Sequence, residues 1–441
     1  MRGLAEFGTS LDGELFSPDS PGYEAIRRPV NAAYREVRPR LVVLCRSVSD
    51  VVEAMAYATA TGDRLAPRGG GHCFAGRSST DGIVLDMSGL DGIFVGDDGS
   101  ATIGAGAHLG QVYAALHAYG RTLPAGCGPT VGITGLTLGG GIGLLGRKYG
   151  LTCDHLAGAQ VVLADGTVVD CDRDHEPELF WALRGAGGGQ FGVVTALRFD
   201  TVPEPVTTRI EARWPGAALG ELVTAWQAWA SDAPDELTVN LTLESDPGAP
   251  VQATLFGAAT LEEGPTRELV QSFLVHRAGV AAAIELHAGL PYHDLKSTFA
   301  DPRSLPERAV RSRSEFFSHG LSDGTLASLL TQLGSSRNRG RRQLAFTAMG
   351  GAYNRVAEDA TAFAHRGERF LLEHVADAAD PWVDRSWTTA HVDGSGRVYP
   401  NFPDPALDDW AAAYHAGNYP RLAAVKNAYD PHRFFDFPQA I

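Results

Sequence analysis

The sequence is poor in cysteine, in long apolar runs and in positive charge, and each shortage excludes a class of protein. Its five cysteines are an odd number in 441 residues and form no CxxC pair, which argues against a disulfide framework and against a zinc site. Residues 1–20 lack the apolar core of a signal peptide, and no later run is long enough to span a membrane. We therefore expect reduced thiols, no metal, no membrane partner and a soluble, cytoplasmic protein.

Positive charge is scarce because 37 Lys and Arg residues stand against 52 Asp and Glu residues, which gives a net charge of -15. Such a chain is not expected to bind nucleic acid. Hydrophobic residues make up 44% and charged residues 20%, a balance that predicts a folded globule. The length of 441 residues suggests roughly two or three domains. The motifs HExxH and GxxxxGK[ST] are absent, which excludes the simplest zinc-protease and P-loop interpretations.

Glycine, in contrast, is abundant, and one glycine loop is the most informative segment of the chain. Residues 68–76 read RGGGHCFAG and place His72 directly after three glycines. Successive glycines let backbone N–H groups converge on phosphate oxygens, and the histidine supplies a nucleophile beside that anion site. Such a cluster can equally be a plain surface turn. A second glycine-rich stretch, GCGPTVGITGLTLGGGIG over residues 126–143, favours a ligand site.

The pattern of apolar residues predicts a mixed α and β region up to Pro203-Glu204-Pro205, which we interpret as a domain boundary. Expected strands are 41–45, 64–67, 83–86, 102–106 and 191–199, with a hairpin over 159–170 around an Asp-Gly turn. Expected helices are 51–60, opened by a Ser49-Asp50 cap and closed by Gly62, then 109–118 and 178–184.

The region from 204 to 397 has a different pattern of apolar and polar residues. Strands are expected over 237–243, 252–258, 343–349 and 370–376, with helices between them such as 219–231, which predicts an antiparallel sheet with helices. From Tyr399 the pattern becomes helical, over 407–416 and 419–428. The domains are therefore expected at 1–203, 204–397 and 398–441.

Four segments in this order resemble the berberine bridge enzyme-like FAD-linked oxidases, in the superfamily of p-cresol methylhydroxylase and vanillyl-alcohol oxidase. They are the 68–76 loop, PTVGITGLTLGGGIG followed by RKYGLTCD, LFWALRGAGGGQFGVVT, and a tail with YPNFPD and VKNAYDP. The resemblance implies an α+β protein with a PCMH-type FAD-binding domain of two α/β subdomains, formed by the first and last segments of the chain. The inserted domain would bind substrate on an antiparallel β-sheet covered by helices.

The resemblance also implies FAD as cofactor and a covalent bond from the His72 ring to the flavin 8α-methyl group. The alternative is a histidine that only hydrogen-bonds a phosphate. Arg68, Gly69, Gly70 and Gly71 would hold the pyrophosphate. The other implied cofactor contacts are Cys73, Gly76, Cys127, Gly128, Thr130, Val131, Gly132, Thr134, Gly135, Gly139, Gly140, Gly141, Gly143, Gly192, Val193, Val194, Tyr399 and Asn401.

A second flavin linkage is not expected. Many family members attach the flavin also through a cysteine immediately before Pro-Thr-Val-Gly, where this chain has Gly128. Cys127 stands one residue earlier, and in an extended segment a shift of one residue turns the side chain to the opposite face. Cys73, Cys153 and Cys171 are expected to be ordinary buried thiols.

The catalytic base is expected to be an acid rather than a tyrosine. Family members often use the second tyrosine of Tyr-x-Asn-Tyr, but this chain has Phe402 there. Others take an acid from the strand after a Phe-x-His-Arg turn, which here is Glu373. A strand packed over a flavin would desolvate that carboxylate and suit it to base catalysis. The alternative is a surface carboxylate on an edge strand, and Tyr353 and Tyr149 are further candidates.

The resulting hypothesis is an FAD-dependent oxidase. It would take a hydride from a carbon bearing a hydroxyl or amine, or from an activated ring position, of a sugar or secondary metabolite, and pass the electrons to O2 with release of peroxide. Two alternatives stay open: an oxidative cyclase or oxygenating tailoring enzyme of natural-product biosynthesis, and a protein that binds FAD without turnover. The expected partners are the small substrate and O2, with the chain as a monomer or homodimer.

Overall fold

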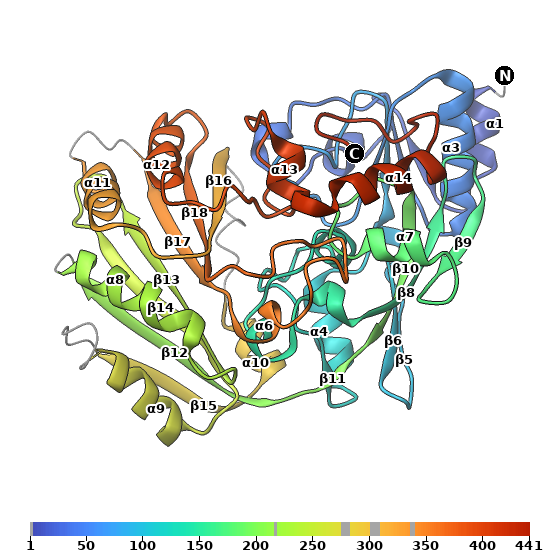
Figure 1. Ribbon diagram of the computed structural model, residues 1–441. Helices are drawn as coiled ribbons and strands as arrows, with labels where there is room; N and C mark the ends of the chain where they lie inside the picture. Colours follow the sequence, from blue (N-terminus) through green and yellow to red (C-terminus); the bar gives the residue numbers. More distant parts are fainter. Residues whose placement is uncertain (1–2, 216–217, 275–282, 300–308, 336–339) are drawn as a thin grey trace.

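The computed structural model describes residues 3–215, 218–274, 283–299, 309–335 and 340–441, which form two lobes (Figure 1). We call residues 3–203 with 398–441 the N-terminal lobe, and residues 206–397 the central lobe. The division of the chain at 203 and 397 stays a prediction. Outside the main sheets lie α1 (Leu4–Thr9), α2 (Tyr23–Ile26) and the pair β7 (Arg121–Thr122) with β11 (Val202–Pro203).

The first sheet of the N-terminal lobe has the order β1 (Glu14–Phe16), β2 (Leu41–Leu44), β4 (Ile83–Asp86), β3 (Leu65–Arg68). Strands β2, β4 and β3 run parallel, and α3 (Val48–Thr61) connects β2 to β3. This helix is capped by Ser47 and not by the expected Ser49. The reason is a capping box, in which Ser47 and Asp50 each accept a hydrogen bond from the other's backbone N–H. Gly62 closes the helix in the left-handed region, as expected.

The second sheet of this lobe is antiparallel, with the order β5 (Ile93–Val95), β6 (Ser100–Gly104), β10 (Val193–Asp200), β8 (Leu156–Val162), β9 (Val168–Cys171). The predicted hairpin is confirmed, because β8 and β9 pair directly and Gly166 takes a left-handed conformation in the turn. Between residues 105 and 192 the lobe also contains the helices α4 (Leu109–His117), α5 (Ile133–Leu138), α6 (Gly146–Tyr149) and α7 (Pro177–Leu183).

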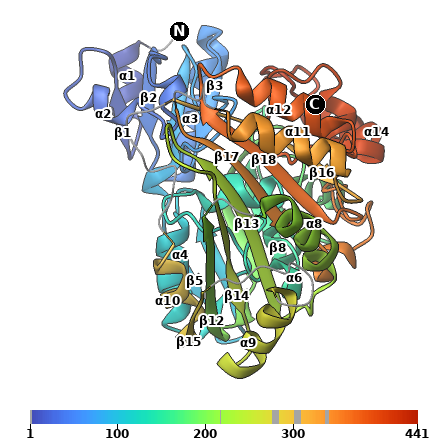
Figure 2. The same ribbon diagram turned by 90° about the vertical axis from the view of Figure 1, so that its left-hand side faces the viewer.

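The central lobe confirms the predicted antiparallel sheet. Its seven strands lie in the order β15 (Ile284–Pro291), β12 (Val206–Pro215), β14 (Gln252–Ala259), β13 (Leu237–Ser245), β17 (Arg342–Ala348), β18 (Phe370–Asp377), β16 (Val310–Phe317). One face is covered by α8 (Leu219–Trp229), α9 (Glu263–Ser272), α11 (Asp323–Leu333) and α12 (Trp382–His391) (Figure 2).

Side-chain alternation divides the residues of this sheet between two faces. On β13, Leu237, Val239 and Leu241 pack in the apolar core beneath the helices, so Thr238 and Asn240 take the inner face, which turns toward the N-terminal lobe (Figure 1). The short helix α10 (Tyr292–Ser297) packs against α4 of the other lobe. The inner face and the joint near α10 are therefore where the two lobes meet.

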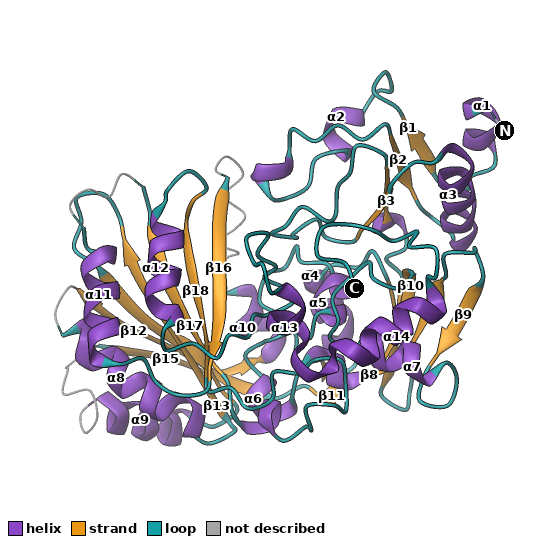
Figure 3. Cartoon of the chain, turned by 45° about the horizontal axis from the view of Figure 1, so that its top comes forward, coloured by secondary structure: helices purple, strands orange, loops and turns teal. Residues whose placement is uncertain are grey.

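The C-terminal segment returns to the N-terminal lobe, where α14 (Tyr419–Tyr429) lies beside α7 (Figure 3). The preceding helix α13 (Trp410–His415) is shorter than the expected 407–416. It begins late because residues 404–407 form a turn closed by a hydrogen bond from Leu407 N to Asp404 O. It ends where Ala416 adopts a positive φ of 46°.

Candidate active site

A cavity of about 510 Å³ lies where four distant parts of the N-terminal lobe converge. It is bounded by the 69–76 glycine loop, the start of α5, the segment around β10, and two stretches of the C-terminal segment. Of the residues predicted from sequence, those lining it are Gly69, Gly70, Gly71, His72, Cys73, Gly76, Gly132, Thr134, Gly135, Gly192, Val194 and Asn401. The fold thus brings the segments predicted from the sequence together around one cavity.

Glycine is required where the two glycine-rich loops touch. A Cβ atom on Gly70 would lie 2.2 Å from the backbone nitrogen of Gly132, a distance that no side chain can occupy. Gly71 and Gly76 have φ values of 69° and 70°, in the left-handed region that glycine favours. The loops are therefore packed backbone to backbone, which leaves their amides near the cavity surface.

Two serines that sequence reasoning missed also line the cavity. The Oγ atoms of Ser78 and Ser79, and Nε of Arg77, are buried and make no hydrogen bond within the described part of the chain. Buried polar groups are normally satisfied, so three such atoms on consecutive residues of a cavity wall suit a ligand rich in acceptor oxygens, such as a diphosphate. The polar run directly after the glycine loop was the available sequence signal.

Arg68 is held through its side chain by backbone carbonyl groups of the N-terminal lobe. Its side chain is 4% exposed, and Nη1 donates to the carbonyl oxygens of Ile26 and Arg27 at 3.0 and 3.1 Å. Its Nε lies 3.9 Å from the Asp86 carboxylate. The guanidinium is not among the groups lining the cavity, although its buried Nε and Nη2 make no hydrogen bond within the described residues. The expected contact of Arg68 with the pyrophosphate stays a prediction.

His72 lines the cavity and is only partly buried. Its Nε2 atom lies 3.0 Å from Thr130 Oγ1, in the other glycine-rich stretch. The rings of Phe74 and Phe402 meet edge to face with centroids 5.3 Å apart. Thr130 itself does not line the cavity. Its hydroxyl orients the His72 imidazole, which does line the cavity.

The cysteines divide into two groups. Cys153 and Cys171 are buried as expected, and burial raises the pKa of the Cys171 thiol to about 12. Cys73 lines the cavity and is only half-buried, which corrects the expectation of a buried thiol. Neither Cys127 nor Gly128 lines the cavity.

The remaining predicted cofactor contacts form the wall behind the lining. Tyr399 Oη accepts hydrogen bonds from the backbone nitrogens of Gly141 and Ile142 at 3.0 and 3.1 Å. Asn401 Nδ2 donates to Tyr399 Oη at 3.0 Å. Tyr399 therefore braces the backbone at Gly141 and Ile142 from outside the cavity. The other predicted contacts that do not line it are Val131, Gly139, Gly140, Gly141, Gly143 and Val193.

Glu373 lies on β18, with β17 on one side and β16 on the other, and is 7% exposed. The alternative of a surface carboxylate on an edge strand is therefore wrong. Ser312 Oγ on β16 donates to Glu373 Oε1 at 2.7 Å. Leu371, two residues earlier and so on the same sheet face, packs with Ile142 of the N-terminal lobe. Glu373 thus lies on the inner face of the sheet, outside the lining of the cavity.

The two tyrosine candidates are placed differently. Tyr353 is 1% exposed, and its hydroxyl donates to Gly143 O at 2.8 Å and accepts from Gly143 N at 3.0 Å. Burial raises its pKa. Tyr149 ends α6 and is half-buried, and burial raises its pKa as well. Neither lines the cavity, and the Tyr353 hydroxyl is engaged by backbone groups on both sides.

A glycine-walled cavity with buried hydroxyls and a histidine at its side suits a nucleotide cofactor, and comparison with known proteins identifies the cofactor. Residues 39–172 match the FAD binding domain family, and residues 398–441 match the family described as berberine and berberine like. The FAD-linked oxidoreductase YgaK of Bacillus subtilis is 32% identical, with 98% of this chain and 97% of YgaK covered. This protein is therefore an FAD-linked oxidoreductase.

Solved structures agree. The berberine bridge enzyme-like 1 protein of Physcomitrella patens superposes with a TM-score of 0.90 at 28% identity, covering 100% of this chain and 99% of that one. The glucooligosaccharide oxidase of Acremonium strictum superposes with a TM-score of 0.87 at 26% identity. This match covers 98% of this chain and 96% of that one. The chain belongs to the berberine bridge enzyme-like FAD-linked oxidoreductases, and its α+β fold is of the expected PCMH type. Within the described residues, no helix has the length and apolar character to cross a membrane.

Proposed function

We propose that this protein is an oxidase. It would remove a hydride from a hydroxyl- or amine-bearing carbon, or from an activated ring position, of a small organic substrate, with release of H2O2. Bound FAD supplies the hydride acceptor and the reaction with oxygen. Two related proteins support this activity: the Acremonium enzyme, and (R)-6-hydroxynicotine oxidase of Paenarthrobacter nicotinovorans, which is 41% identical over 198 residues, 44% of this chain and 43% of that protein.

The observation that carries the proposal is the His72–Thr130 pair at the cavity. Nε2 lies 3.0 Å from Thr130 Oγ1, and the tautomer that donates to this hydroxyl from Nε2 keeps the lone pair of the imidazole on Nδ1. A neutral, oriented imidazole is a competent nucleophile, so His72 would hold the cofactor covalently through Nδ1. The Acremonium enzyme supports this assignment, because its FAD is attached to a histidine as well as to a cysteine.

For the proton, we propose Glu373 as general base. The carboxylate is buried on the inner sheet face, and the Ser312 hydroxyl fixes its direction through the 2.7 Å hydrogen bond. A positioned carboxylate can accept the proton from a substrate hydroxyl or amine as the hydride leaves. Tyr353 and Tyr149 stay reserve candidates, and the Gly143 contacts of Tyr353 favour a structural part for it.

Phe402 favours one competing function. Its ring packs against Phe74 and Tyr399 with centroids 5.3 and 5.0 Å apart, and it has no hydroxyl to accept a proton. A site without that phenol is also compatible with an oxidative cyclase, which would release peroxide as it closes a ring, or with an oxygenating enzyme, which would consume oxygen without releasing an equivalent of peroxide.

A peroxide assay tests the proposal. Purified protein is incubated with panels of sugars, amines and aromatic natural products, while oxygen uptake and peroxide are measured together. Equal amounts of both support an oxidation with peroxide release, with or without ring closure in the product, whereas oxygen uptake without peroxide supports the oxygenating alternative. The His72→Ala variant and heat-denatured protein are the controls. Failure of every compound to bleach the flavin under anaerobic conditions would favour a protein that binds FAD without turnover.

A further inference from the structure

Arg77 is a cavity residue whose side chain is held by the C-terminal segment. It directly follows the 69–76 glycine loop and lines the cavity together with Phe437. Its guanidinium carbon lies 4.9 Å from the centroid of the Phe437 ring, and Nη2 donates to Gln439 Oε1 at 3.0 Å. Two residues of the last segment of the chain therefore fix an arginine that stands beside the first glycine loop.

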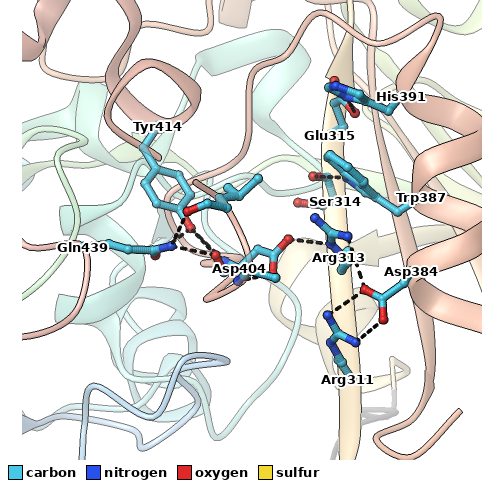
Figure 4. Close-up of polar contacts among 12 residues, drawn as sticks. Arg311, Arg313, Ser314, Glu315, Asp384, Trp387, His391, Asp404, Tyr414 and Gln439 are labelled. Atoms are coloured by element: carbon cyan, nitrogen blue, oxygen red, sulfur yellow. Dashed lines mark hydrogen bonds and ion pairs between the residues drawn. The ribbon is translucent and has the colours of Figure 1, made fainter. Parts of the chain in front are cut away.

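The Gln439 amide has partners at both of its ends. Oε1 accepts from Arg77 Nη2 and lies 3.1 Å from the Tyr414 hydroxyl. Nε2 donates to the backbone oxygen of Asp404 at 2.9 Å (Figure 4) and to that of Leu407 at 3.3 Å. A guanidinium can only donate and a carbonyl oxygen can only accept, so these partners allow one orientation of the amide. Gln439 therefore holds Arg77 from a fixed position.

Arg77 keeps its positive charge, because the group that holds it is neutral. An amide oxygen accepts a hydrogen bond without neutralising the guanidinium, as a carboxylate would do. The nearby carboxylate of Asp404 is already paired with Arg313. Asp81 and Asp436 also line the cavity, but neither forms an ion pair with Arg77 in the described part of the chain. The cavity wall therefore contains a cation that no protein carboxylate neutralises.

One donor of this cation is left for a ligand. Nε of Arg77 is buried and makes no hydrogen bond with any described residue. The next two residues, Ser78 and Ser79, have buried hydroxyls in the same condition and line the same cavity. A diphosphate offers acceptor oxygens together with negative charge, and arginine binds such groups through charge-assisted hydrogen bonds.

From this arrangement we propose that Arg77 binds the diphosphate of the cofactor, and that Gln439 couples this contact to the docking of the C-terminal segment on the central lobe. The coupling runs through Asp404, whose backbone oxygen accepts from Gln439 and whose carboxylate pairs with Arg313 of β16 (Figure 4). FAD binding and the Asp404–Arg313 pair therefore stabilise each other, because coupling between two sites is reciprocal.

The coupling has a consequence for the proposed reaction. Arg313 stands next to Ser312 on β16, and the Ser312 hydroxyl donates to Glu373 at 2.7 Å. A bound cofactor therefore also steadies the strand beside the proposed base. This last step rests on the proposed function, whereas the binding of FAD through Arg77 and Gln439 does not.

Titration with FAD tests the contact in a His72→Ala background, where the cofactor binds reversibly. At low salt, Arg77→Gln should raise the Kd of FAD about ten- to a hundredfold, the usual effect of a lost hydrogen bond to a charged group. The rise should shrink as salt screens the charge. The control is Arg421→Gln, which removes the same charge from a residue that pairs with Glu178 outside the cavity. An equal rise in the control, or one in Arg77→Gln that salt does not change, would overturn the contact.

A double-variant comparison tests the positioning role of Gln439. Gln439→Leu removes the amide and should raise the Kd of FAD nearly as much as Arg77→Gln does. Combined with Arg77→Gln, it should add little, because both changes remove the same interaction. If the two fold-changes multiply in full, Gln439 does not act through Arg77 and the positioning role is wrong.

Hydrogen–deuterium exchange measures the coupling itself in His72→Ala protein, with and without FAD. Peptides covering residues 404–414, which do not line the cavity, should exchange more slowly when FAD is bound. With Gln439→Leu added, saturating FAD should no longer slow them. Equal exchange in His72→Ala with and without FAD would overturn the coupling even if an Arg77 or Gln439 variant fails to fold. Because no substrate is used, a protein that proves not to be an oxidase leaves these tests intact.

Discussion

Arg313 of β16 and Asp404 of the C-terminal segment form a buried ion pair between the lobes, with 2.5 Å between Nε and Oδ2 (Figure 4). Their side chains are 9% and 2% exposed. Arg313 also donates to Asp384 at 3.2 Å and lies over the Trp387 ring. The side chain of Gln439 donates to the backbone oxygen of Asp404 at 2.9 Å. One arginine thus ties the edge strand beside Glu373 to the C-terminal segment.

Asp404→Asn should destabilise the protein markedly. It leaves a buried guanidinium with only the exposed Asp384 as anion, and breaking a buried pair costs about 3 kcal/mol. The midpoint of urea unfolding measures this. The matched control is Asp232→Asn, which breaks the exposed pair with Arg369 at 2.7 Å and should cost less than about 1 kcal/mol. Equal shifts in the two variants would contradict the interpretation.

Thr130→Val should slow covalent attachment of the flavin, because it removes the hydroxyl that orients His72. Acid precipitation measures attachment, since bound flavin stays in the pellet and free flavin passes into the supernatant. We expect full release in His72→Ala and partial release in Thr130→Val. The control is Thr134→Val, a cavity residue whose hydroxyl donates to Ala105 O at 3.0 Å. If Thr130→Val retains its flavin as the unmodified protein does, the orienting role is refuted.

Peptide mapping should find flavin on the peptide that contains His72 and none on the peptide that contains Cys127. The reason is the position of Cys127, which does not line the cavity. Mass spectrometry of a digest, with flavin absorbance as a guide, measures this. A species that joins both peptides through one flavin would show the second linkage to exist.

Ser78→Ala and Ser79→Ala should each weaken FAD binding in a His72→Ala background, where the cofactor binds reversibly. Their hydroxyls are buried in the cavity wall without a protein partner among the described residues. Hydrogen bonds to a charged group contribute about 1.5 kcal/mol, which corresponds to about a tenfold rise in Kd. Flavin fluorescence titration measures Kd. Thr80→Ala is the control, because its hydroxyl already contacts Asp81, and a similar rise there would point to a general loosening of the loop.

Local patterns were enough to place the elements around the cavity but not the directions of long side chains. The strand at 83–86 and the Asp-Gly hairpin follow from apolar runs and turn chemistry, which depend on neighbours in sequence. The direction of Arg68 is set by carbonyl groups 41 and 42 residues away. The reach of Lys296 to Gly126 spans 170 residues. Such contacts form only when the lobes pack together, so no local sequence pattern predicts them.

The edge strand β16 is another element that local sequence patterns did not predict. Residues 310–317 read VRSRSEFF, in which arginines and serines alternate. This pattern gave no strand prediction because it lacks an apolar face. In the structure the arginines meet Asp384 and Asp404, and Ser312 meets Glu373. Partners on other elements therefore satisfy a strand that looks unsuitable on its own.

The final prediction concerns the residue that accepts the substrate proton. Glu373→Gln keeps the shape of the side chain and its contact with Ser312 but removes the basic oxygen, so it should slow anaerobic flavin reduction by about 10²–10⁴-fold, the usual effect of a positioned general base. The substrate is the one found in the peroxide screen, and stopped-flow absorbance measures the rate. Flavin attachment should not change, because Glu373 lies outside the cavity lining.

Two further variants separate positioning from proton transfer. Ser312→Ala removes the 2.7 Å hydrogen bond that orients Glu373 and should slow reduction less than Glu373→Gln does, with a shifted pH profile. Tyr353→Phe removes the hydroxyl held by Gly143 and should cost stability more than rate. If Glu373→Gln reduces its flavin at a near-normal rate while Tyr353→Phe does not, the base is Tyr353. Normal rates in both would mean that the proton leaves to solvent or to another residue, with Tyr149 as the remaining candidate.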